Sequence, residues 1–426
     1  MPQDVAGQED WTNEAHAVGQ RARAASRQLA AAGTSAKNAA LRAMASGLRD
    51  RTAEIIKENA GDLAAGRAAH LTPAMLDRLG LTTERIEKMA RSLEEIADLR
   101  DPVGEILEGY TRPNGLQIQR VRVPLGVVLA IYESRPNVTS DIAALCLKSG
   151  NAAILRGGRE SIRSNMIIHR VLVEAVTAQG LPADAVQLID NPDRALLAAL
   201  LREDRNIDVV IPRGGEELIR AVAQQSTIPV IKHYKGVCHI YVDELADLDM
   251  AEAICFNAKV QRPGTCNAME TLLVHKNVAA RFLPRAARRL AEAGVEIRGC
   301  DRTRRIVSAA KPATEDDWYA EYLDLVLAVR VVDDIQEAID HIAQYSSNHT
   351  DAIVSEDLRR VQQFVRDVDS SSVMINTSTR FSDGGEYGLG AEVGISTDKL
   401  HARGPMGCRD LTTYKWVVYG NGQVRT

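Results

Sequence analysis

The chain has 426 residues, of which 45% are hydrophobic and 26% charged, a balance typical of a globular protein and unlike that of a disordered or fibrous chain. Its length exceeds that of one compact core, so we expect about two or three domains. The formal net charge is -5 and the isoelectric point is about 6.0, so the overall charge favours neither nucleic acid nor an anionic membrane as a partner.

The six cysteines are spread widely along the chain and show no CxxC or metal-ligand spacing, and the histidines do not cluster. We therefore expect free thiols, no metal site and a reducing compartment. The N-terminal sequence MPQDVAGQEDW lacks a basic region followed by an apolar run, and no window approaches about 18 uninterrupted apolar residues. These features predict a cytoplasmic protein.

The first long region, residues 12–99, is rich in Ala, Arg, Glu and Leu. Apolar residues recur at helical spacing over residues 40–66 and again over residues 82–99, which predicts amphipathic helices packed on a core. Thr82 and Thr83 precede glutamates and are suited to cap the second of these segments.

The pattern changes after residue 101. Behind a Pro-Asn-Gly turn that ends at Gly115, apolar and polar residues alternate up to Val123, which predicts a two-sided strand or a hairpin. The C-terminal stretch RDLTTYKWVVYGNGQVRT, residues 409–426, is also rich in strand-forming residues. Two such segments, distant in the chain, could pair with each other.

Short apolar runs alternate with helical stretches from Val127 to Ile231. This alternation predicts a mostly parallel sheet covered on both faces, with ligands at the carboxyl ends of its strands. The predicted strands are 127–133, 152–156, 185–189, 207–212 and 228–232, and the predicted helices are 140–148, 161–178, 194–201 and 216–225.

Two glycine turns follow predicted strands, at residues 156–159 (RGGR) and 213–215 (RGG). Glycine lets a backbone approach a phosphate, and a helix that begins just afterwards points its amides at the anion. Neither turn matches G-x-G-x-x-G, and ordinary strand-to-helix turns also use glycine. The arginines of the first turn suit a terminal phosphate, although a solvated arginine is the alternative.

A second α/β region covers residues 251–373, and Cys266 lies between its first helix and its first long strand. The small residues Gly264 and Thr265 precede the thiol, so it is positioned as an accessible nucleophile whose backbone amide could stabilise an oxyanion. The alternative is a small buried apolar side chain. The predicted elements are helices 250–260, 278–294, 334–344 and 357–368 and strands 270–275, 323–332 and 351–355.

Several ordered segments resemble the gamma-glutamyl phosphate reductase family of the aldehyde dehydrogenase superfamily. They include VPLGVVLAIYESRPNVTSDIAALCLKSGNAAILRGG, VVIPRGG, IKHYKGVCHIYVD, VQRPGTCNAMETLLVH and GLGAEVGISTDKLHARGPMG, and the likeness spans nearly the whole chain except the first dozen residues, taken as a variable tail. The resemblance implies an aldehyde dehydrogenase-like α/β fold. It divides the chain into a Rossmann-like NADPH-binding domain (12–113 and 126–238), a catalytic domain (239–400) and a β-ribbon (114–125 and 403–426) that makes a homo-oligomer.

The resemblance also implies the reaction. L-glutamate 5-phosphate would be reduced by NADPH to glutamate 5-semialdehyde with release of phosphate, the second step of proline biosynthesis from glutamate. Cys266 would attack the acyl phosphate to give a thioester, which takes the hydride. The Cys266 amide and the Asn137 side chain would stabilise the oxyanions. Glutamate kinase, which supplies the acyl phosphate, is a candidate partner.

One motif departs from the wider superfamily. Hydrolytic members carry E-L-G-G-K, whose glutamate activates water against the thioester, whereas this chain has HYKG at residues 233–236. Without that carboxylate, hydride transfer competes better with hydrolysis. His233 is an alternative base, ranked below a role in packing or substrate contact.

For the cofactor, Arg156 falls where many relatives place a lysine that contacts the adenosine ribose or its 2'-phosphate. Glu321 resembles the superfamily glutamate in E-x-F-G-P that contacts the nicotinamide ribose, although LDL replaces F-G-P. The expected NADPH-binding residues are Arg156, Gly157, Arg159, Gly214, Gly215 and Glu321.

The glutamyl carboxylate and amino group need ionic partners. The loop NTSTRFSDGG offers Ser378, Arg380 and Asp383, and Arg262 precedes the thiol. Two other functions stay open on the residues alone: an NAD(P)-dependent aldehyde dehydrogenase or acylating relative with another substrate, and a noncatalytic scaffold that keeps the fold.

Overall fold

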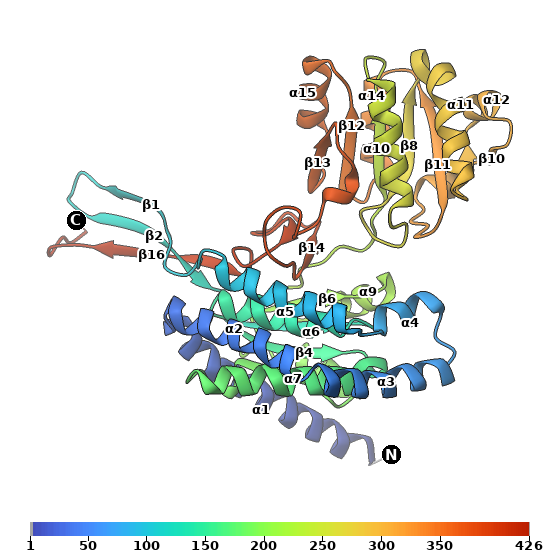
Figure 1. Ribbon diagram of the computed structural model, residues 1–426. Helices are drawn as coiled ribbons and strands as arrows, with labels where there is room; N and C mark the ends of the chain where they lie inside the picture. The colour runs from blue at the N-terminus through green and yellow to red at the C-terminus, as the bar shows by residue number, and fades with distance from the viewer. Residues whose placement is uncertain (1–2, 426) are drawn as a thin grey trace. The chain divides into compact units, whose positions relative to one another are not determined.

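The computed structural model describes residues 3–425, without the side chains of residues 3–10 and Ala74, and the chain divides into two compact units (Figure 1). The first unit comprises Met1–Lys232, Gly388–Gly394 and Met406–Thr426, and the second comprises His233–Tyr387 and Ile395–Pro405. The predicted division at residues 238/239 therefore differs from the observed one. Residues 233–238 belong with the second unit because they lead directly into its strand β7 (Cys238–Val242).

The first unit contains a four-stranded parallel sheet in the order β5-β4-β3-β6. Its strands are β3 (Val127–Tyr132), β4 (Ala152–Gly157), β5 (Val186–Leu188) and β6 (Val209–Arg213). Every residue of β3 is buried, as expected of a central parallel strand. This confirms the predicted sheet, and the helices that cover it match the predicted positions.

The predicted strand over residues 228–232 is wrong. It makes only an isolated bridge between Val210 and Val230, in which Val210 donates to the Pro229 carbonyl and Ile231 donates to the Val210 carbonyl. Pro229 has no backbone N–H, so the segment cannot continue a ladder on both sides of the bridge.

The first unit also contains helices, several of them long. The predicted helix over residues 40–66 is two helices that meet at Arg51, and Thr82 caps the helix that follows by accepting a hydrogen bond from the Arg85 amide at 3.3 Å. The first helix begins at Gln3, so residues 3–12 of the expected tail belong to it. The helices are α1 (Gln3–Ala31), α2 (Thr34–Asp50), α3 (Thr52–Ala68), α4 (Pro73–Leu79), α5 (Thr83–Asp98), α6 (Asn137–Lys148), α7 (Ile162–Ala178), α8 (Arg194–Leu200) and α9 (Glu216–Gln225).

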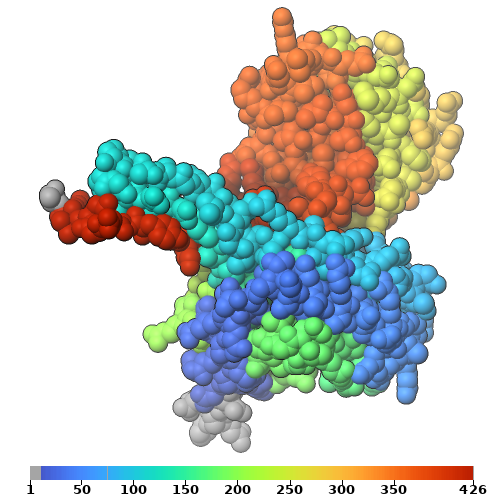
Figure 2. Space-filling model, turned by 60° about the vertical axis from the view of Figure 1, so that its left-hand side comes forward, coloured from blue at the N-terminus to red at the C-terminus, as the bar shows by residue number. Residues whose placement is uncertain are grey.

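A three-stranded antiparallel ribbon extends from the first unit, visible in Figure 2 as an arm of cyan and red. Its central strand β2 (Gln117–Pro124) pairs with β16 (Thr412–Tyr419), which is the predicted association of two distant segments. Its third strand, β1 (Ile106–Thr111), lies outside the predicted ribbon range of 114–125. It is the first arm of the hairpin that the sequence offered as an alternative around the Pro-Asn-Gly turn, although the run ILEGYT has little alternation and contains a register shift near Ile106.

The second unit contains a seven-stranded parallel sheet in the order β10-β9-β11-β8-β7-β12-β13. The central strands β7 and β8 are wholly buried. Its strands besides β7 are β8 (Met269–His275), β9 (Glu296–Gly299), β10 (Lys311–Pro312), β11 (Val326–Val332), β12 (Thr350–Val354) and β13 (Ser372–Ile375). Two short strands, β14 (Gly394–Ser396) and β15 (Gly404–Met406), pair where the chain passes between the units.

Helices cover both faces of this second sheet. One apolar cluster joins β8 and β11 to α10 and α11, and another joins β7 and β12 to α14 and α15. The helices are α10 (Leu248–Val260), α11 (Lys276–Glu292), α12 (Asp301–Ile306), α13 (Glu315–Trp318), α14 (Ile335–Tyr345) and α15 (Leu358–Asp367). None of the helices within residues 3–425 is long and apolar enough to cross a membrane.

Candidate active site

Cys266 lies in the loop that connects α10 to β8. The loop turns tightly, because Ala268 donates to the Thr265 carbonyl and the Thr265 hydroxyl donates to the Arg262 carbonyl. Cys266 is partly exposed, as is Cys300, whereas the other four cysteines are buried. Burial raises the pKa of each of those four thiols, which keeps them protonated. Accessibility therefore separates Cys266 from most thiols of the chain.

The segment 233–236 passes directly against this loop. An added Cβ on Gly236 would lie 1.9 Å from the carbonyl oxygen of Cys266 and 2.6 Å from its Cα, so only glycine fits. The Gly236 amide donates to Glu321 at 2.8 Å, and the Cys238 thiol donates to the Cys266 carbonyl at 3.2 Å. These bonds hold the backbone of the thiol loop in place.

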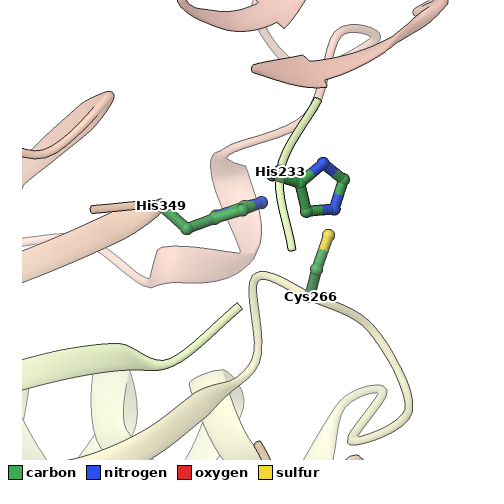
Figure 3. Close-up of side chains that lie close together, drawn as sticks. All are labelled: His233, Cys266 and His349. Atoms are coloured by element: carbon green, nitrogen blue, oxygen red, sulfur yellow. The ribbon is translucent and has the colours of Figure 1, made fainter. Parts of the chain in front are cut away.

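Two histidines face Cys266. The ligand atoms of His233, Cys266 and His349 all lie within 4.8 Å of one another (Figure 3). The Nδ1 atom of His233 contacts the Ile395 carbonyl at 2.8 Å, so the other ring nitrogen faces the sulfur. His233 could be singled out from the sequence but His349 could not, because the two lie far apart in the chain and meet only when β12 packs beside β7.

A cationic group lies beside the same loop. Arg380 donates to the Asn267 side chain and, at 2.8 Å, to the Gln261 side chain. Burial and the nearby Arg262 lower the pKa of Arg380, and Asp383 and Cys266 act in the opposite direction. Of the four residues proposed for the glutamyl group, Ser378 is engaged as the cap of the short helix at 379–381, where it accepts from the Arg380 amide.

Glu321 lies just before β11, and its carboxylate accepts a hydrogen bond from the Gly236 amide in the segment 233–236. The following backbone is unusual, since Leu323 has a left-handed φ of 53° and its amide donates to buried Glu270 at 3.2 Å. Glu270 also pairs with buried Lys259. Burial raises the pKa of Glu270 to about 7, and Lys259 opposes that shift. This network holds the backbone two residues after Glu321.

Asn137 is the first residue of α6, in the first unit. Its side-chain amide donates to Asp141 at 3.0 Å, which fixes its orientation. Burial raises the pKa of Asp141 to about 6. One hydrogen of the Asn137 side-chain amide is used in this bond, and the second hydrogen can be donated to another acceptor.

The first predicted cofactor turn ends β4. Arg156 is partly buried there and donates to the Pro192 carbonyl at 3.0 Å, whereas Arg159 is exposed. Burial lowers the pKa of Arg156, Glu160 opposes that shift, and Arg194 at the start of α8 adds to it. Arg194, which sequence analysis did not single out, therefore joins Arg156 as a positive charge at the carboxyl end of the sheet.

Side chains lie close to two of the predicted cofactor glycines. A Cβ on Gly157 would lie 2.1 Å from the Asn165 amide nitrogen, and one on Gly214 would lie 2.6 Å from a Glu133 oxygen. Gly215 faces open space, and its amide donates to Glu133 at 3.0 Å. A carboxylate thus already uses the amide at the start of α9.

The family profile described as "Aldehyde dehydrogenase family" matches residues 7–305, which is more than half of the chain. The chain belongs to the aldehyde dehydrogenase family, and the fold confirms the predicted α/β class. It is therefore an oxidoreductase of that family.

Within the family, the chain is similar to proteins named gamma-glutamyl phosphate reductase. It is 56% identical to the one from Moorella thermoacetica, covering 97% of this chain and 99% of the relative, and 56% identical to the one from Geobacter metallireducens, covering 95% and 97%. The crystal structure of the gamma-glutamyl phosphate reductase from Thermotoga maritima has a TM-score of 0.94 and 46% identity, covering 97% of this chain and 100% of that one. These relationships confirm the resemblance found in the sequence.

Proposed function

We propose that this enzyme reduces L-glutamate 5-phosphate to L-glutamate 5-semialdehyde, with release of phosphate, through a thioester on Cys266, as the second step of proline biosynthesis from glutamate. The observation that carries the proposal is the environment of Cys266, a partly exposed thiol held by backbone contacts and faced by imidazoles. The names of the relatives that match nearly the whole chain supply the substrate.

The first chemical step uses the thiol. The ring nitrogen of His233 that faces the sulfur is placed to accept its proton, because Nδ1 already contacts the Ile395 carbonyl. The thiolate then attacks the acyl carbon of the substrate, and the bond to phosphate breaks. Phosphate departs with the electron pair and leaves the glutamyl group on sulfur as a thioester.

Two donors would stabilise the oxyanions on either side of the thioester: the Cys266 amide and the Asn137 side-chain amide. Asn137 is suited to the role because Asp141 orients it and leaves one amide hydrogen for a ligand. Collapse of the second oxyanion breaks the C–S bond, releases the aldehyde and returns the thiolate.

NADPH is the cofactor that we propose, and when bound it supplies the hydride that converts the thioester to the aldehyde level. Arg156 and Arg159, at the carboxyl end of β4, would hold its 2'-phosphate, with Arg194 adding positive charge. The open space at Gly215 fits a ligand approaching the backbone, whereas Gly157 and Gly214 serve local packing as well. Glu321, fixed by Gly236, would contact the nicotinamide ribose.

The substrate's own charges need partners close to the thiol. Arg380 is held against Asn267, the residue after the nucleophile, and is the best placed of the proposed cations to bind the glutamyl carboxylate. Asp383 is near enough to Arg380 to influence its charge and would bind the ammonium group. Arg262, which is close enough to Arg380 to affect its pKa, is a second candidate cation for the glutamyl carboxylate.

Three proposals concern assembly, location and partners. The ribbon of β1, β2 and β16 exposes aromatic and branched side chains, which supports a homo-oligomer built through it. The six cysteines form no disulfide, which supports a reducing cytoplasm. Glutamate kinase, as the source of the acyl phosphate, is the proposed functional partner.

The thioester can be tested directly. The enzyme is mixed, without NADPH, with glutamate 5-phosphate generated by a glutamate kinase and ATP, then quenched in acid and digested for mass spectrometry. The proposal predicts one glutamyl group on the peptide that contains Cys266, and none in Cys266→Ala or without ATP. A glutamyl group on another residue, or substrate reduction by Cys266→Ala at the normal rate, would contradict it.

A further inference from the structure

The group formed by His233, Cys266 and His349 has a composition that the reduction itself does not require. One thiol and two imidazoles converge, with their ligand atoms all within 4.8 Å of one another. A base for the thiol needs only one imidazole, so the second histidine raises a separate question. Thiolate and imidazole are the ligands that Zn²⁺ prefers, and three protein ligands with one open position form a common type of zinc site.

The supporting contacts resemble those of metal-binding histidines. Such histidines usually bind the metal through one ring nitrogen while the other is held by a carbonyl, carboxylate or other outer group. In His233, Nδ1 contacts the Ile395 carbonyl at 2.8 Å, and in His349, Nδ1 contacts the Thr350 hydroxyl at 2.9 Å. In both rings the remaining nitrogen is on the side of the sulfur (Figure 3).

The backbone around these residues limits how far they must move. Gly236 packs on the Cys266 backbone, and the two imidazole rings already make an edge-to-face contact with centroids 5.4 Å apart. Bond lengths of about 2.0–2.3 Å place the ligands of a tetrahedral zinc ion closer together than 4.8 Å. Rotation of the partly exposed side chains of Cys266 and His233 toward buried His349 would bring the three ligand atoms within bonding distance of one ion. Because these two side chains are partly exposed, the ion can reach the site from solvent.

We propose that His233, Cys266 and His349 form an inhibitory binding site for a thiophilic divalent ion, Zn²⁺. Binding replaces the S–H bond with a Zn–S bond, and the proton passes to solvent. The coordinated sulfur is then unavailable for attack on an acyl carbon. Metal binding follows from the donor geometry alone, whereas inhibition also rests on the proposed role of Cys266.

Co²⁺ is the probe for metal binding, because it occupies sites similar to those of Zn²⁺ and a cobalt-thiolate bond gives a charge-transfer band in the near ultraviolet. The full-length protein is freed of metal with a chelator and titrated with Co²⁺. We expect one Co²⁺ per chain with this band, and bleaching when Zn²⁺ is added. Cys266→Ser should abolish the band, and His233→Asn should weaken binding by at least about 10-fold, since even outer partners of a ligand cost 10–100-fold.

Two matched variants control for other thiols and histidines. Cys300→Ser removes the other partly exposed thiol, and His70→Asn removes an exposed histidine at a left-handed position that asparagine tolerates. Both should bind Co²⁺ like the wild type. A band that persists in Cys266→Ser, unchanged affinity in His233→Asn, or no Co²⁺ bound at all would overturn the site.

The third ligand and the inhibition are tested in parallel. His349→Asn should weaken Co²⁺ binding as His233→Asn does. Because His349 is buried, circular dichroism is used to check that the His349→Asn variant folds. If it does not fold, Cys266→Ser and His233→Asn decide whether the site exists. Zn²⁺ should inhibit the wild-type reaction reversibly on chelator addition, with an inhibition constant at least about 10-fold higher in His233→Asn. Stoichiometric Co²⁺ binding without inhibition by Zn²⁺ would refute the inhibitory role while leaving the metal site intact.

Discussion

The backbones of Gly236 and Cys266 are in direct contact: a Cβ on Gly236 would lie 1.9 Å from the carbonyl oxygen of Cys266 and 2.5 Å from its carbonyl carbon. These distances are far below van der Waals contact, and the obstacle is backbone, which cannot rotate away. The segment that carries His233 and the loop that carries the thiol are therefore positioned by the same glycine.

Gly236→Ala should separate the two segments. Displacement of a catalytic group by about 1 Å can cost on the order of 100-fold in rate, so kcat/KM should fall at least that far. The matched control is Gly33→Ala, because a Cβ there meets nothing within 4 Å. Steady-state kinetics on both variants, with thermal melts to verify folding, make the comparison. Full activity in a folded Gly236→Ala would show that the close approach does not matter for catalysis.

Arg380→Ala should weaken substrate binding selectively. Loss of a hydrogen bond to a charged group costs about 1.5–3 kcal/mol, so KM for the glutamyl substrate should rise roughly 10- to 100-fold, with KM for NADPH unchanged. Arg366→Ala, which removes an exposed arginine paired with its neighbour Asp367 on α15, is the control. Equal increases in KM for both ligands would argue for a general disturbance of the loop instead.

Arg156→Ala should reduce the preference for NADPH over NADH. The guanidinium would be lost from the 2'-phosphate but not from the common part of the dinucleotide, so KM should rise roughly 10-fold or more for NADPH and little for NADH. Arg202→Ala, from the turn after α8, serves as a surface control. If Arg156→Ala leaves the NADPH to NADH ratio unchanged, the 2'-phosphate is bound elsewhere.

Trp416→Glu should dissociate the oligomer. Tyr414, Trp416 and Val418 alternate along β16 and are 47%, 50% and 53% exposed, so they present one apolar face that a partner would cover. A buried charge on this face is costly. Light scattering coupled to gel filtration should give a smaller mass for Trp416→Glu than for wild type, with Lys415→Glu, on the opposite face, as control. A monomeric wild-type protein would contradict the proposed role of the ribbon.

The parallel sheets were largely predictable from sequence. The apolar run of β3 and the mostly apolar strand β8 are buried on both faces and flanked by segments with clear helical periods. The errors have local causes: Pro229 interrupts one predicted strand, and β10 has only two residues. β1 is predictable only as the first arm of the hairpin alternative, because its own residues lack alternation. The first unit ends its long N-terminal segment at Lys232, whereas the sequence prediction placed this boundary at residue 238, because IKHYKGVCHIYVD shows no break in its pattern.

The site was less predictable than the fold. Cys266 could be proposed from its loop and its family motif, and Arg380 as one of several polar residues in the loop NTSTRFSDGG. His349 could not, since no local pattern connects it to Cys266, and only the pairing of β12 with β7 brings it there. Likewise, the glycines at 157 and 214 looked like phosphate-binding positions, whereas their packing against Asn165 and Glu133 becomes visible only in three dimensions.

The most direct test of the account is the reverse reaction: reduction of NADP⁺ by the purified enzyme with glutamate 5-semialdehyde, with and without phosphate, for wild type and Cys266→Ala. We predict strict dependence on phosphate, because only phosphate can release the glutamyl group from the thioester, and complete loss of turnover in the variant. Turnover without phosphate would indicate a hydrolytic aldehyde dehydrogenase, and unchanged turnover in Cys266→Ala would remove the thiol from the mechanism.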